Sequence, residues 1–413
     1  MSVIRACVVL GLLAVASSQP VNNLPVLKEA PQEVLFREGT PFAVECVTAS
    51  GDGKLFKYKW TKNGQPLNLK DNANIVQRQN EGTLVFLRPS ISDEGAYQCL
   101  GESQYGTAST RVIQIRRTYL EAQKYEVQKH TPIEGRTFKL DCPAPKAYPK
   151  PDIEWRSLQA ADPIVSGEIQ DARITVGPDG ALYFANVTED DASERFKYVC
   201  LASSPAVDKP VVLAEHFISS LKKDTKPQDH EVVLQYASPD TTARVGDMIF
   251  LYCIYGGNPL AHPDWFKDGK DVNNEPGARI TRYNRSVGKR LLIRGVLPED
   301  EGVYRCAVDN EVGKKQEHTM KLTVVGAPKF TKKPEKITTV KQGDDITIPC
   351  EVSGLPAPKL TYTYSAEPLK SARVTAANGF SIKKIEKTDS GYYGCNATNE
   401  YGSAYYETLV NVV

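Results

Sequence analysis

One seven-residue pattern occurs three times in the chain: DEGAYQC at residues 93–99, DEGVYRC at 300–306 and DSGYYGC at 389–395. Each copy reads Asp-x-Gly-x-Tyr-x-Cys, so the tyrosine and the cysteine stand two residues apart. Side chains at alternate positions of a β-strand share one face. The pattern therefore predicts a strand that buries its tyrosine and its cysteine together, and its recurrence predicts a repeated β-rich unit.

The cysteines extend this repeat over most of the chain. After Cys7, eight cysteines form four consecutive pairs that are 53, 58, 53 and 45 residues apart. A glycine precedes the first cysteine of each pair by seven residues, and a tyrosine precedes the second by two. Such regular spacing predicts four tandem units with one disulfide in each. The predicted disulfides are Cys46–Cys99, Cys142–Cys200, Cys253–Cys306 and Cys350–Cys395.

The units also carry core residues of an immunoglobulin-type β-sandwich. Twelve to fourteen residues after the first cysteine stands Trp60, Trp155 or Trp265, which would pack on the disulfide between two sheets. Each disulfide closes a loop of roughly fifty residues, which stabilises the fold by about 4 kcal/mol if loop entropy dominates. The turns NEVG (310–313) and NEYG (399–402) resemble those of I-set domains in cell-adhesion proteins. The predicted fold class is all-β, with four tandem sandwiches of the I-set or C2 type.

Two units depart from the common pattern. In the second, DDASERFKYVC (190–200) replaces Asp-x-Gly-x-Tyr-x-Cys, which predicts a remodelled turn before the strand that carries the cysteine. In the fourth, Tyr362 stands where the other units have tryptophan, and the two cysteines are nearest together. We expect a smaller core there, with a phenol hydroxyl that needs a hydrogen-bond partner.

The N-terminus has the composition of a secretory signal peptide. An apolar run follows Arg5, and Ala16 and Ser18 fit the −3 and −1 positions of a cleavage site, which predicts a mature start at Gln19. The alternative is a short buried helix. Cleavage removes Cys7 and leaves an even number of cysteines, as expected of a secreted protein in an oxidising compartment. No C-terminal segment is long and apolar enough for a transmembrane or lipid anchor.

Net charge and motifs exclude several classes of function. Residues 1–18 hold one arginine and no acidic residue, so the mature chain has 50 basic and 50 acidic residues. A neutral chain has no general attraction to nucleic acid or membranes. The five histidines are scattered, and neither G-x-S-x-G nor H-E-x-x-H occurs. We therefore expect no enzyme, with no catalytic residues, no metal site and no cofactor.

The segment SSLKKDTKPQDHEVVL (219–234) interrupts the regular spacing. Successive cysteine pairs lie 43 and 44 residues apart at the outer junctions but 53 residues apart at the central one. Ten extra residues span at most roughly 33–36 Å, enough for domain 2 to fold back on domain 3 and domain 1 on domain 4. A flexible joint or a longer surface loop is the alternative. The predicted organisation is a signal peptide (1–18), domain 1 (19–117), domain 2 (118–218), a long linker that serves as the hinge (219–230), domain 3 (231–326) and domain 4 (327–413).

The segment GARITRYNRSVGKRLLIRGVLP (277–298) is the best candidate for an anion site, because it is rich in cations and has no acidic residue. Its strand is expected to direct Arg290 and Arg294 outward from one sheet, with Arg279 beside them. Clustered guanidinium groups bind phosphate in bidentate fashion. The alternative is a solvated sheet face balanced by acids from elsewhere. The candidate phosphate- or lipopolysaccharide-binding residues are Arg279, Arg282, Lys289, Arg290 and Arg294.

Three sequons predict N-linked glycans in a secreted protein: Asn186 in NVT, Asn284 in NRS and Asn396 in NAT. Asn284 lies at the expected tip of the basic hairpin. A glycan at that position would partly shield the candidate phosphate site.

Over its whole length the chain resembles the hemolin family, immune proteins of insect haemolymph related to the first four domains of neural adhesion molecules. The resemblance rests on the signal peptide, the four I-set-like units, the lack of an anchor, the linker position and the mature start near QPVNNLPVLKEAPQEVLF (19–36). It implies a horseshoe of domains, secretion into haemolymph, and binding to bacterial lipopolysaccharide, lipoteichoic acid, haemocyte surface proteins and further copies of the chain. The alternative is a soluble homophilic or heterophilic cell-adhesion protein with no specific microbial ligand. A third class, an intracellular array of the muscle type, does not fit the signal peptide and four disulfides.

Overall fold

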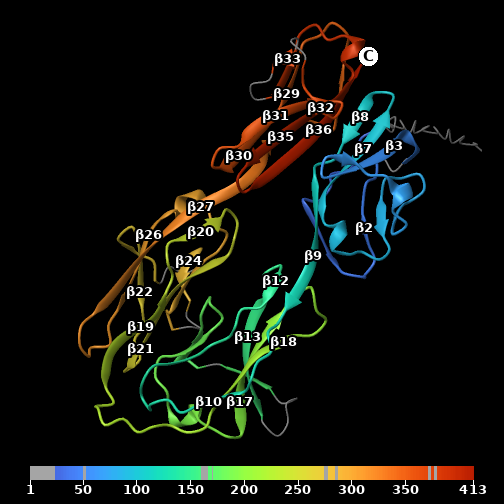
Figure 1. Ribbon diagram of the computed structural model, residues 1–413. Helices are drawn as coiled ribbons and strands as arrows, with labels where there is room; N and C mark the ends of the chain where they lie inside the picture. The colour runs from blue at the N-terminus through green and yellow to red at the C-terminus, as the bar shows by residue number, and fades with distance from the viewer. Residues whose placement is uncertain are drawn as a thin grey trace, which may run out of the picture.

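Four β-sandwiches follow one another along the chain and bend into a horseshoe. The computed structural model describes residues 24–49, 53–159, 166–169, 171–273, 278–283, 287–370, 374–375 and 379–413, and the predicted signal peptide lies outside these ranges. Figure 1 shows the first sandwich (blue) beside the fourth (red) and the second (green) beside the third (yellow). We call them domains 1 to 4. The predicted all-β fold and the predicted horseshoe are both confirmed.

Domains 1 and 2 each pair a larger sheet with a three-stranded one. The larger sheet of domain 1 has the order β1–β9–β7–β3–β4, with β8 paired to β7, and the smaller has β2–β6–β5. Domain 2 has the orders β10–β18–β17–β13–β14 and β11–β16–β15. The strands of domain 1 are β1 (Glu33–Arg37), β2 (Phe42–Val44), β3 (Lys57–Lys62), β4 (Gln65–Pro66), β5 (Ile75–Gln77), β6 (Leu84–Phe86), β7 (Gly95–Ser103), β8 (Gly106–Ser109) and β9 (Ile113–Glu121). Those of domain 2 are β10 (Gln128–His130), β11 (Phe138–Leu140), β12 (Lys146–Tyr148), β13 (Asp152–Gln159), β14 (Ser166–Glu168), β15 (Ile174–Val176), β16 (Leu182–Phe184), β17 (Phe196–Ser203) and β18 (Val211–Ile218).

Domains 3 and 4 also each pair two sheets, and the smaller sheet has four strands in domain 3 and three in domain 4. Domain 3 has the sheet orders β20–β27–β26–β22–β23 and β19–β21–β25–β24, and domain 4 has β28–β36–β35–β31–β32 and β29–β34–β33. The strands of domain 3 are β19 (His230–Ala237), β20 (Thr241–Arg244), β21 (Ile249–Asn258), β22 (Asp264–Lys267), β23 (Lys270–Asp271), β24 (Ile280–Arg282), β25 (Arg290–Ile293), β26 (Gly302–Val308) and β27 (Gln316–Lys332). Those of domain 4 are β28 (Ile337–Val340), β29 (Ile346–Pro349), β30 (Glu351–Leu355), β31 (Lys359–Tyr364), β32 (Glu367–Pro368), β33 (Val374–Thr375), β34 (Gly379–Ile382), β35 (Gly391–Asn399) and β36 (Gly402–Val412).

Each core is built around one disulfide and one aromatic side chain, which is buried in domains 1 to 3 and partly buried in domain 4. The structure joins Cys46 to Cys99, Cys142 to Cys200, Cys253 to Cys306 and Cys350 to Cys395. In domains 1 to 3 the tryptophan indole donates to a glycine carbonyl, as Trp265 does to Gly288 at 2.7 Å. In domain 4 the hydroxyl of Tyr362 accepts the backbone N–H of Gly379 at 3.2 Å. The tyrosine therefore replaces the missing tryptophan with a hydrogen bond of opposite direction.

The tyrosine two residues before the second cysteine of each domain donates its hydroxyl to a backbone carbonyl. Tyr304 donates to the carbonyl of Asp300, four residues earlier, at 2.8 Å. In domain 2, Tyr198 donates instead to Asp191, seven residues earlier, at 3.2 Å. The longer separation shows that the turn in domain 2 is remodelled, while the hydrogen bond from the tyrosine is kept.

The outer junctions are continuous strands. β9 leaves domain 1 and pairs with β12 of domain 2, and β27 leaves domain 3 and pairs with β30 of domain 4. The predicted domain boundaries after residues 117 and 326 fall inside these two strands. A strand shared by two sandwiches holds them end to end, so each arm of the horseshoe is straight (Figure 1).

The central linker is fastened to domain 2. Between β18 and β19, Lys222 bridges Ile133, and its carbonyl accepts the N–H of Glu134 at 2.9 Å. Lys223 pairs with Glu134 at 2.6 Å, and Asp224 pairs with Arg136. The surplus residues thus carry the chain along the edge of domain 2 before it enters domain 3.

Candidate functional site

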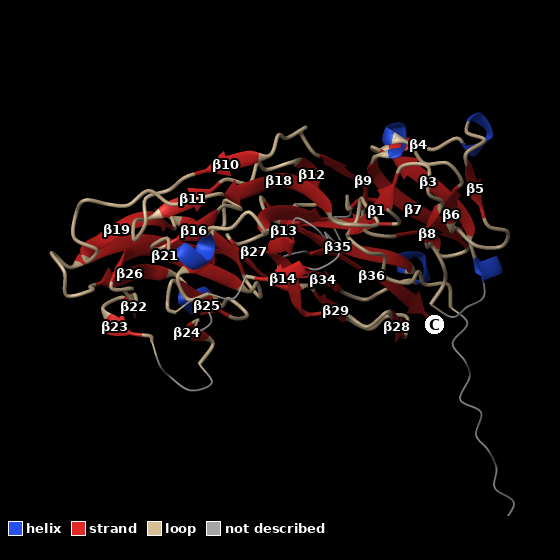
Figure 2. Ribbon diagram, turned by 90° about the horizontal axis from the view of Figure 1, so that it is seen from below, coloured by secondary structure: helices blue, strands red, loops and turns tan. Residues whose placement is uncertain are grey.

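Two interfaces close the horseshoe, and they are built differently. Domains 2 and 3 meet through the outward faces of β11–β16–β15 and β19–β21–β25–β24, which lie over one another in Figure 2. Tyr183 of β16 points outward because its neighbours Leu182 and Phe184 fill the core of domain 2. It packs with Ile254 and other outward residues of domain 3 in a small apolar cluster. This contact joins two sheet faces.

Polar contacts to backbone atoms reinforce the interface between domains 2 and 3. The amide nitrogen of Gln235 donates to the carbonyls of Phe138 and Phe184 at 3.2 and 2.9 Å. The backbone N–H of Gly257 donates to the carbonyl of Ala185 at 3.0 Å. Backbone groups are held by their own strands, so these bonds require one relative position of the two domains.

Lys289 lies inside this interface and is fully buried. Its ammonium group donates to the carbonyls of Ala172 and Arg173 of domain 2, at 2.9 and 3.2 Å. Burial lowers the pKa of Lys289 to about 7, although nearby Asp171 acts to raise it. Lys289 was a candidate for binding phosphate, and that prediction is wrong for this residue because domain 2 covers it.

The other candidate cations differ in their partners, although Arg279 lies beside Arg294 and donates to its carbonyl at 3.2 Å. Arg279 forms a bidentate ion pair with buried Asp300, both nitrogen–oxygen distances being 2.9 Å, so it serves the core turn of domain 3. Arg282 pairs with Asp264 at 3.2 Å. Arg294 is exposed, and we find no ion pair for it among the described residues. Arg279 and Lys289 are therefore removed from the predicted set, and Arg282, Arg290 and Arg294 stay candidates.

Arg290 faces a groove between domains 2 and 3. Its guanidinium carbon lies 4.7 Å from the ring centre of Tyr283 and 5.1 Å from that of Phe250. The groove has a volume of about 1210 Å³, and its lining includes Lys150, Asp152, Glu154, Tyr252, Tyr283 and Arg290. Of the candidate cations, Arg290 is the one that lines this groove, where it lies with carboxylates of domain 2.

The three sequons differ in their surroundings. Asn186 is buried, and its side-chain nitrogen, the atom that would carry a glycan, donates to the carbonyl of Gly257 at 2.9 Å. A glycan cannot fit there in the closed horseshoe, so the prediction for Asn186 is wrong for this conformation. Asn396 is partly exposed on β35, and Asn284 lies outside the described residues.

Domains 1 and 4 meet through an edge and a face. Domain 4 contributes the outward face of β35 and β36, including Tyr392 and Leu409. Domain 1 contributes its N-terminal segment (residues 24–30) and the bend between β8 and β9. Val26, Leu27 and Phe56 of domain 1 form one apolar cluster with the two residues of domain 4. The hydroxyl of Tyr392 donates to the carbonyl of Pro25 at 2.6 Å.

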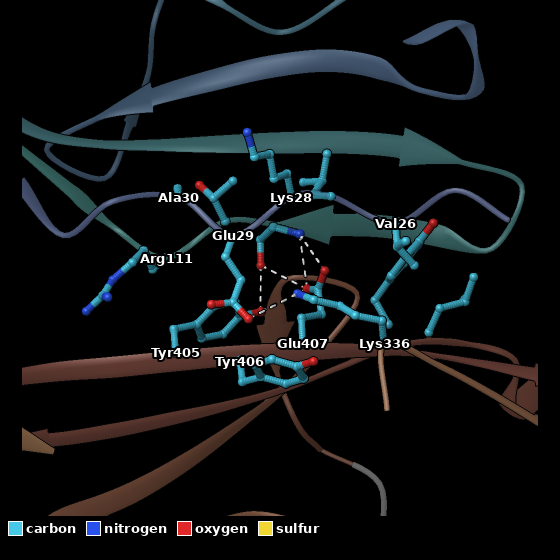
Figure 3. A pocket seen from close by; sticks show the side chains of 14 residues that line it. Val26, Lys28, Glu29, Ala30, Arg111, Lys336, Tyr405, Tyr406 and Glu407 are labelled. Carbon is cyan, nitrogen blue, oxygen red and sulfur yellow. Dashed lines mark hydrogen bonds and ion pairs between the residues drawn. The ribbon is translucent and has the colours of Figure 1, made fainter. Parts of the chain in front are cut away.

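A carboxylate lies at the centre of this second interface (Figure 3). Both oxygens of Glu407 accept the backbone N–H of Ser109 at 3.0 Å, and Oε2 also accepts the Ser109 hydroxyl at 3.1 Å. Tyr405, on the same strand, donates its hydroxyl to Oε2 at 2.8 Å. Burial raises the pKa of Glu407 to about 7, against the lowering effect of these donors and of Lys336.

Charged groups surround the rim of the second interface. Lys333 pairs with Glu29 at 3.1 Å, and Lys336 approaches the same carboxylate at 3.9 Å. Arg111 donates to the carbonyl of Ser403 at 2.5 Å. Burial lowers the pKa of Lys336, which also lies over the ring of Tyr406 at 4.4 Å.

Sequence reasoning missed Glu407, Tyr405 and Ser109. One signal was present in the strand pattern: Tyr405 and Leu409 alternate with buried residues of β36, so two large apolar groups face outward beside Glu407. An outward apolar stripe predicts a covered face. It does not show which of the other domains covers it.

Among the described residues, no group of three or more histidine, cysteine, aspartate or glutamate side chains is arranged to hold a metal ion. The described part of the chain also has no helix that is long and apolar enough to span a membrane.

Comparison with known proteins gives consistent matches along the chain. The immunoglobulin I-set domain model matches residues 232–324 and 328–412, and an immunoglobulin domain model matches residues 25–102. Hemolin of Hyalophora cecropia is 52% identical over 413 residues, which cover 100% of this chain and 98% of that protein. Neuroglian of Drosophila melanogaster is 34% identical over 100% of this chain but only 32% of its own length.

A solved structure shares the arrangement of the domains. The crystal structure of the insect immune protein hemolin superposes with a TM-score of 0.91 at 52% identity, covering 94% of this chain and 100% of that one. It was described as a new domain arrangement with implications for homophilic adhesion.

Proposed function

The chain belongs to the hemolin family of the immunoglobulin superfamily, and on that basis we propose that it is a secreted innate-immune recognition protein of haemolymph. Its class, a non-enzymatic immune or cell-adhesion protein, follows from the family. The proposal adds the ligands: lipopolysaccharide and lipoteichoic acid on bacteria, and proteins on haemocyte surfaces. The observation that carries it is full-length similarity to hemolin in both sequence and domain arrangement.

We place the microbial phosphate groups on the domain 3 side of the groove. Arg290 faces the groove, and the rings of Tyr283 and Phe250 hold its guanidinium group. Its guanidinium group hydrogen-bonds the side chain of Tyr252, and its buried Nε has no hydrogen-bond partner among the described residues. A stacked guanidinium group keeps its remaining N–H donors directed at a ligand, which suits bidentate binding of phosphate. Arg282 and Arg294, on the same hairpin, are the supporting candidates.

Charge reversal tests this site. The double variant Arg290→Glu and Arg294→Glu should weaken binding to immobilised lipopolysaccharide and lipoteichoic acid by at least about tenfold, because each lost phosphate contact costs roughly 1.5–3 kcal/mol. Arg305→Glu is a matched control, because Arg305 also stacks on an aromatic ring of domain 3, that of Phe266 at 4.4 Å, and does not line the groove. Equal binding by the double variant and the control would remove the groove as the ligand site.

Adhesion without a microbial ligand is the second candidate function. It is supported by the similarity to neuroglian and by the homophilic adhesion inferred for the hemolin structure. Beads coated with the protein should then aggregate in the absence of bacterial material, and added lipopolysaccharide should not be required. Aggregation that depends strictly on lipopolysaccharide would favour the first function alone.

Secretion and glycosylation belong to the same proposal. Cleavage after Ser18 would release the mature chain, and Asn284 and Asn396 are the two proposed glycan sites. Mass spectrometry of protein purified from haemolymph should show both modifications and an unmodified Asn186. A glycan on Asn186 would mean that the closed horseshoe is not the form that leaves the cell.

A further inference from the structure

The contact between domains 1 and 4 encloses a carboxyl group that has no ion-pair partner. Among the described residues, no lysine or arginine pairs with Glu407, and the nearby Lys336 is directed at Glu29. The carboxyl group is covered by Ser109 of domain 1. Tyr405 of its own strand, labelled in Figure 3, also covers it. An ionised group is costly to bury without a counter-charge, whereas in a separated pair of domains the same group would be hydrated.

The surrounding hydroxyl groups can hold Glu407 in its neutral form as well. The Ser109 hydroxyl lies 2.7 Å from the Tyr405 hydroxyl and 3.1 Å from Oε2 of Glu407. If Oε2 carries a proton, it can donate to Ser109, whose own hydroxyl then donates to Tyr405. The Tyr405 hydroxyl can turn toward Thr363, which lies beside it. Oε1 continues to accept the Ser109 N–H, so every bond across the interface is kept.

We propose that closure of the horseshoe is linked to uptake of a proton at Glu407, so that acid tightens the contact between domains 1 and 4 and alkali loosens it. This link between protonation and closure does not rest on the ligand proposed above. It gives the molecule a means of exposing the facing surfaces of domains 1 and 4 without breaking the contact between domains 2 and 3.

The direction follows from the two states of the carboxyl group. In the closed horseshoe, burial raises the pKa of Glu407 from 4.5 to about 7. A raised pKa means that the closed state is most favoured below about pH 4.5 and loses that advantage as the pH rises through about 7. With these two values, the ratio of closed to open molecules should fall about tenfold between pH 6 and pH 8.

Other titratable and charged groups also face Glu407. Tyr405 and Tyr392 face it from domain 4, and burial raises the pKa of both phenols, which stay neutral in this range. Lys336 faces it from the segment before β28, and Lys28, Glu29 and Arg111 line the same pocket from domain 1. Burial is the chief cause that lowers the pKa of both Lys336 and Arg111, and the Glu407→Gln reference used below keeps both groups, so their contribution cancels.

Hydrogen exchange at the Ser109 amide measures the opening directly. This N–H donates across the interface to Glu407, so it exchanges when the domains separate. Wild-type protein is compared with Glu407→Gln at each pH, which cancels the chemical dependence of exchange on pH. The ratio of the wild-type rate to the variant rate should rise about tenfold between pH 6 and pH 8. A constant ratio would overturn the proposal.

This test has one control variant and one substitute variant. Glu317→Gln is the matched control, because Glu317 lies on β27, the strand of domain 3 that corresponds to β36, and pairs with Arg305 on the surface. It should keep the wild-type response, and a flat response there would overturn the assignment to Glu407. If Glu407→Gln fails to fold, Tyr405→Phe serves instead, referenced to exchange in the urea-unfolded chain. Loss of a donor to the ionised carboxylate should move the opening midpoint to higher pH, and an unchanged or lower midpoint would contradict the proposal.

Discussion

The contact at the bend of the horseshoe, between domains 2 and 3, is built differently from the contact at its open end, between domains 1 and 4. At the bend, two sheet faces pack and backbone groups of both domains bond directly, as Gly257 does to Ala185. At the open end, an edge of domain 1 rests on a face of domain 4, and the central bonds end on one carboxyl group. Domains 2 and 3 are also consecutive along the chain, so the linker keeps them at high local concentration. We infer that the bend is permanent and the open end is reversible.

The largest expected effect comes from Lys289→Glu. In the wild-type protein the ammonium group of Lys289 donates to the carbonyl oxygens of Ala172 and Arg173. The variant puts a carboxylate, which cannot donate, against these two oxygens. An uncompensated buried charge destabilises a protein by about 3–5 kcal/mol, so domains 2 and 3 should separate. Small-angle scattering should show an extended molecule. Lys270→Glu, at an exposed lysine of the same domain, is the control and should stay compact.

A smaller effect is expected from Gly256→Ala, which tests the close packing at the bend. A Cβ atom at this position would lie 2.0 Å from Cγ2 of Thr137 and 2.6 Å from the carbonyl oxygen of Ala185, both in domain 2. Overpacking of this kind costs about 1–3 kcal/mol. Thermal unfolding should show a lower midpoint. Gly326→Ala, where the nearest atom would lie at 3.4 Å, should leave the midpoint almost unchanged, and equal shifts would contradict the packing argument.

Tyr392→Phe should affect the open end alone. The variant removes the hydroxyl that donates to the carbonyl of Pro25 at 2.6 Å. The same hydroxyl lies 2.9 Å from the hydroxyl of Ser103, also in domain 1. One lost hydrogen bond costs about 1 kcal/mol, so the Ser109 amide should exchange roughly fivefold faster. The Gly257 amide at the bend serves as the internal control. Faster exchange at both amides would show that the two interfaces open together.

The smallest expected effect is a loss of stability of domain 2 in acid. Nε2 of His130 lies 3.0 Å from Nδ1 of His216, and burial lowers the pKa of both rings. A lowered pKa means that domain 2 is most stable above pH 6.5 and loses stability as the pH falls below it. Unfolding of domain 2 in urea should therefore become easier in acid, while the contact between domains 1 and 4 becomes tighter. A parallel response of both regions would contradict the separate roles of the histidines and Glu407.

The fold was accessible from the sequence because its signals are local and repeated. Paired cysteines, Trp60 and its counterparts, and the tyrosine at each turn fall at fixed spacing, and each residue has one physical role in a sandwich. The surplus of residues in the linker was also visible, and it marked the bend. Its attachment to domain 2 through Lys222 and Lys223 was not, because those partners lie far away in the sequence.

The site was predicted less well because it depends on how whole domains pack. The strand pattern correctly directed Arg290 away from its own core, but a pattern cannot show that domain 2 covers that face. The same covering buries Lys289 and Asn186, which both look exposed when domain 3 or domain 2 is considered alone. Ser109 and Glu407 are separated by 298 residues, so no local signal connects them.

Hydrogen exchange at two amides of the same molecule tests most directly whether the bend is permanent and the open end reversible. The N–H of Gly257 crosses from domain 3 to domain 2, and the N–H of Ser109 crosses from domain 1 to domain 4. At pH 8, the Ser109 amide should exchange much faster than the Gly257 amide, and only the Ser109 amide should become better protected, relative to its chemical exchange rate, at pH 6. Equal protection of the two amides at both pH values, or faster exchange at Gly257, would contradict this division.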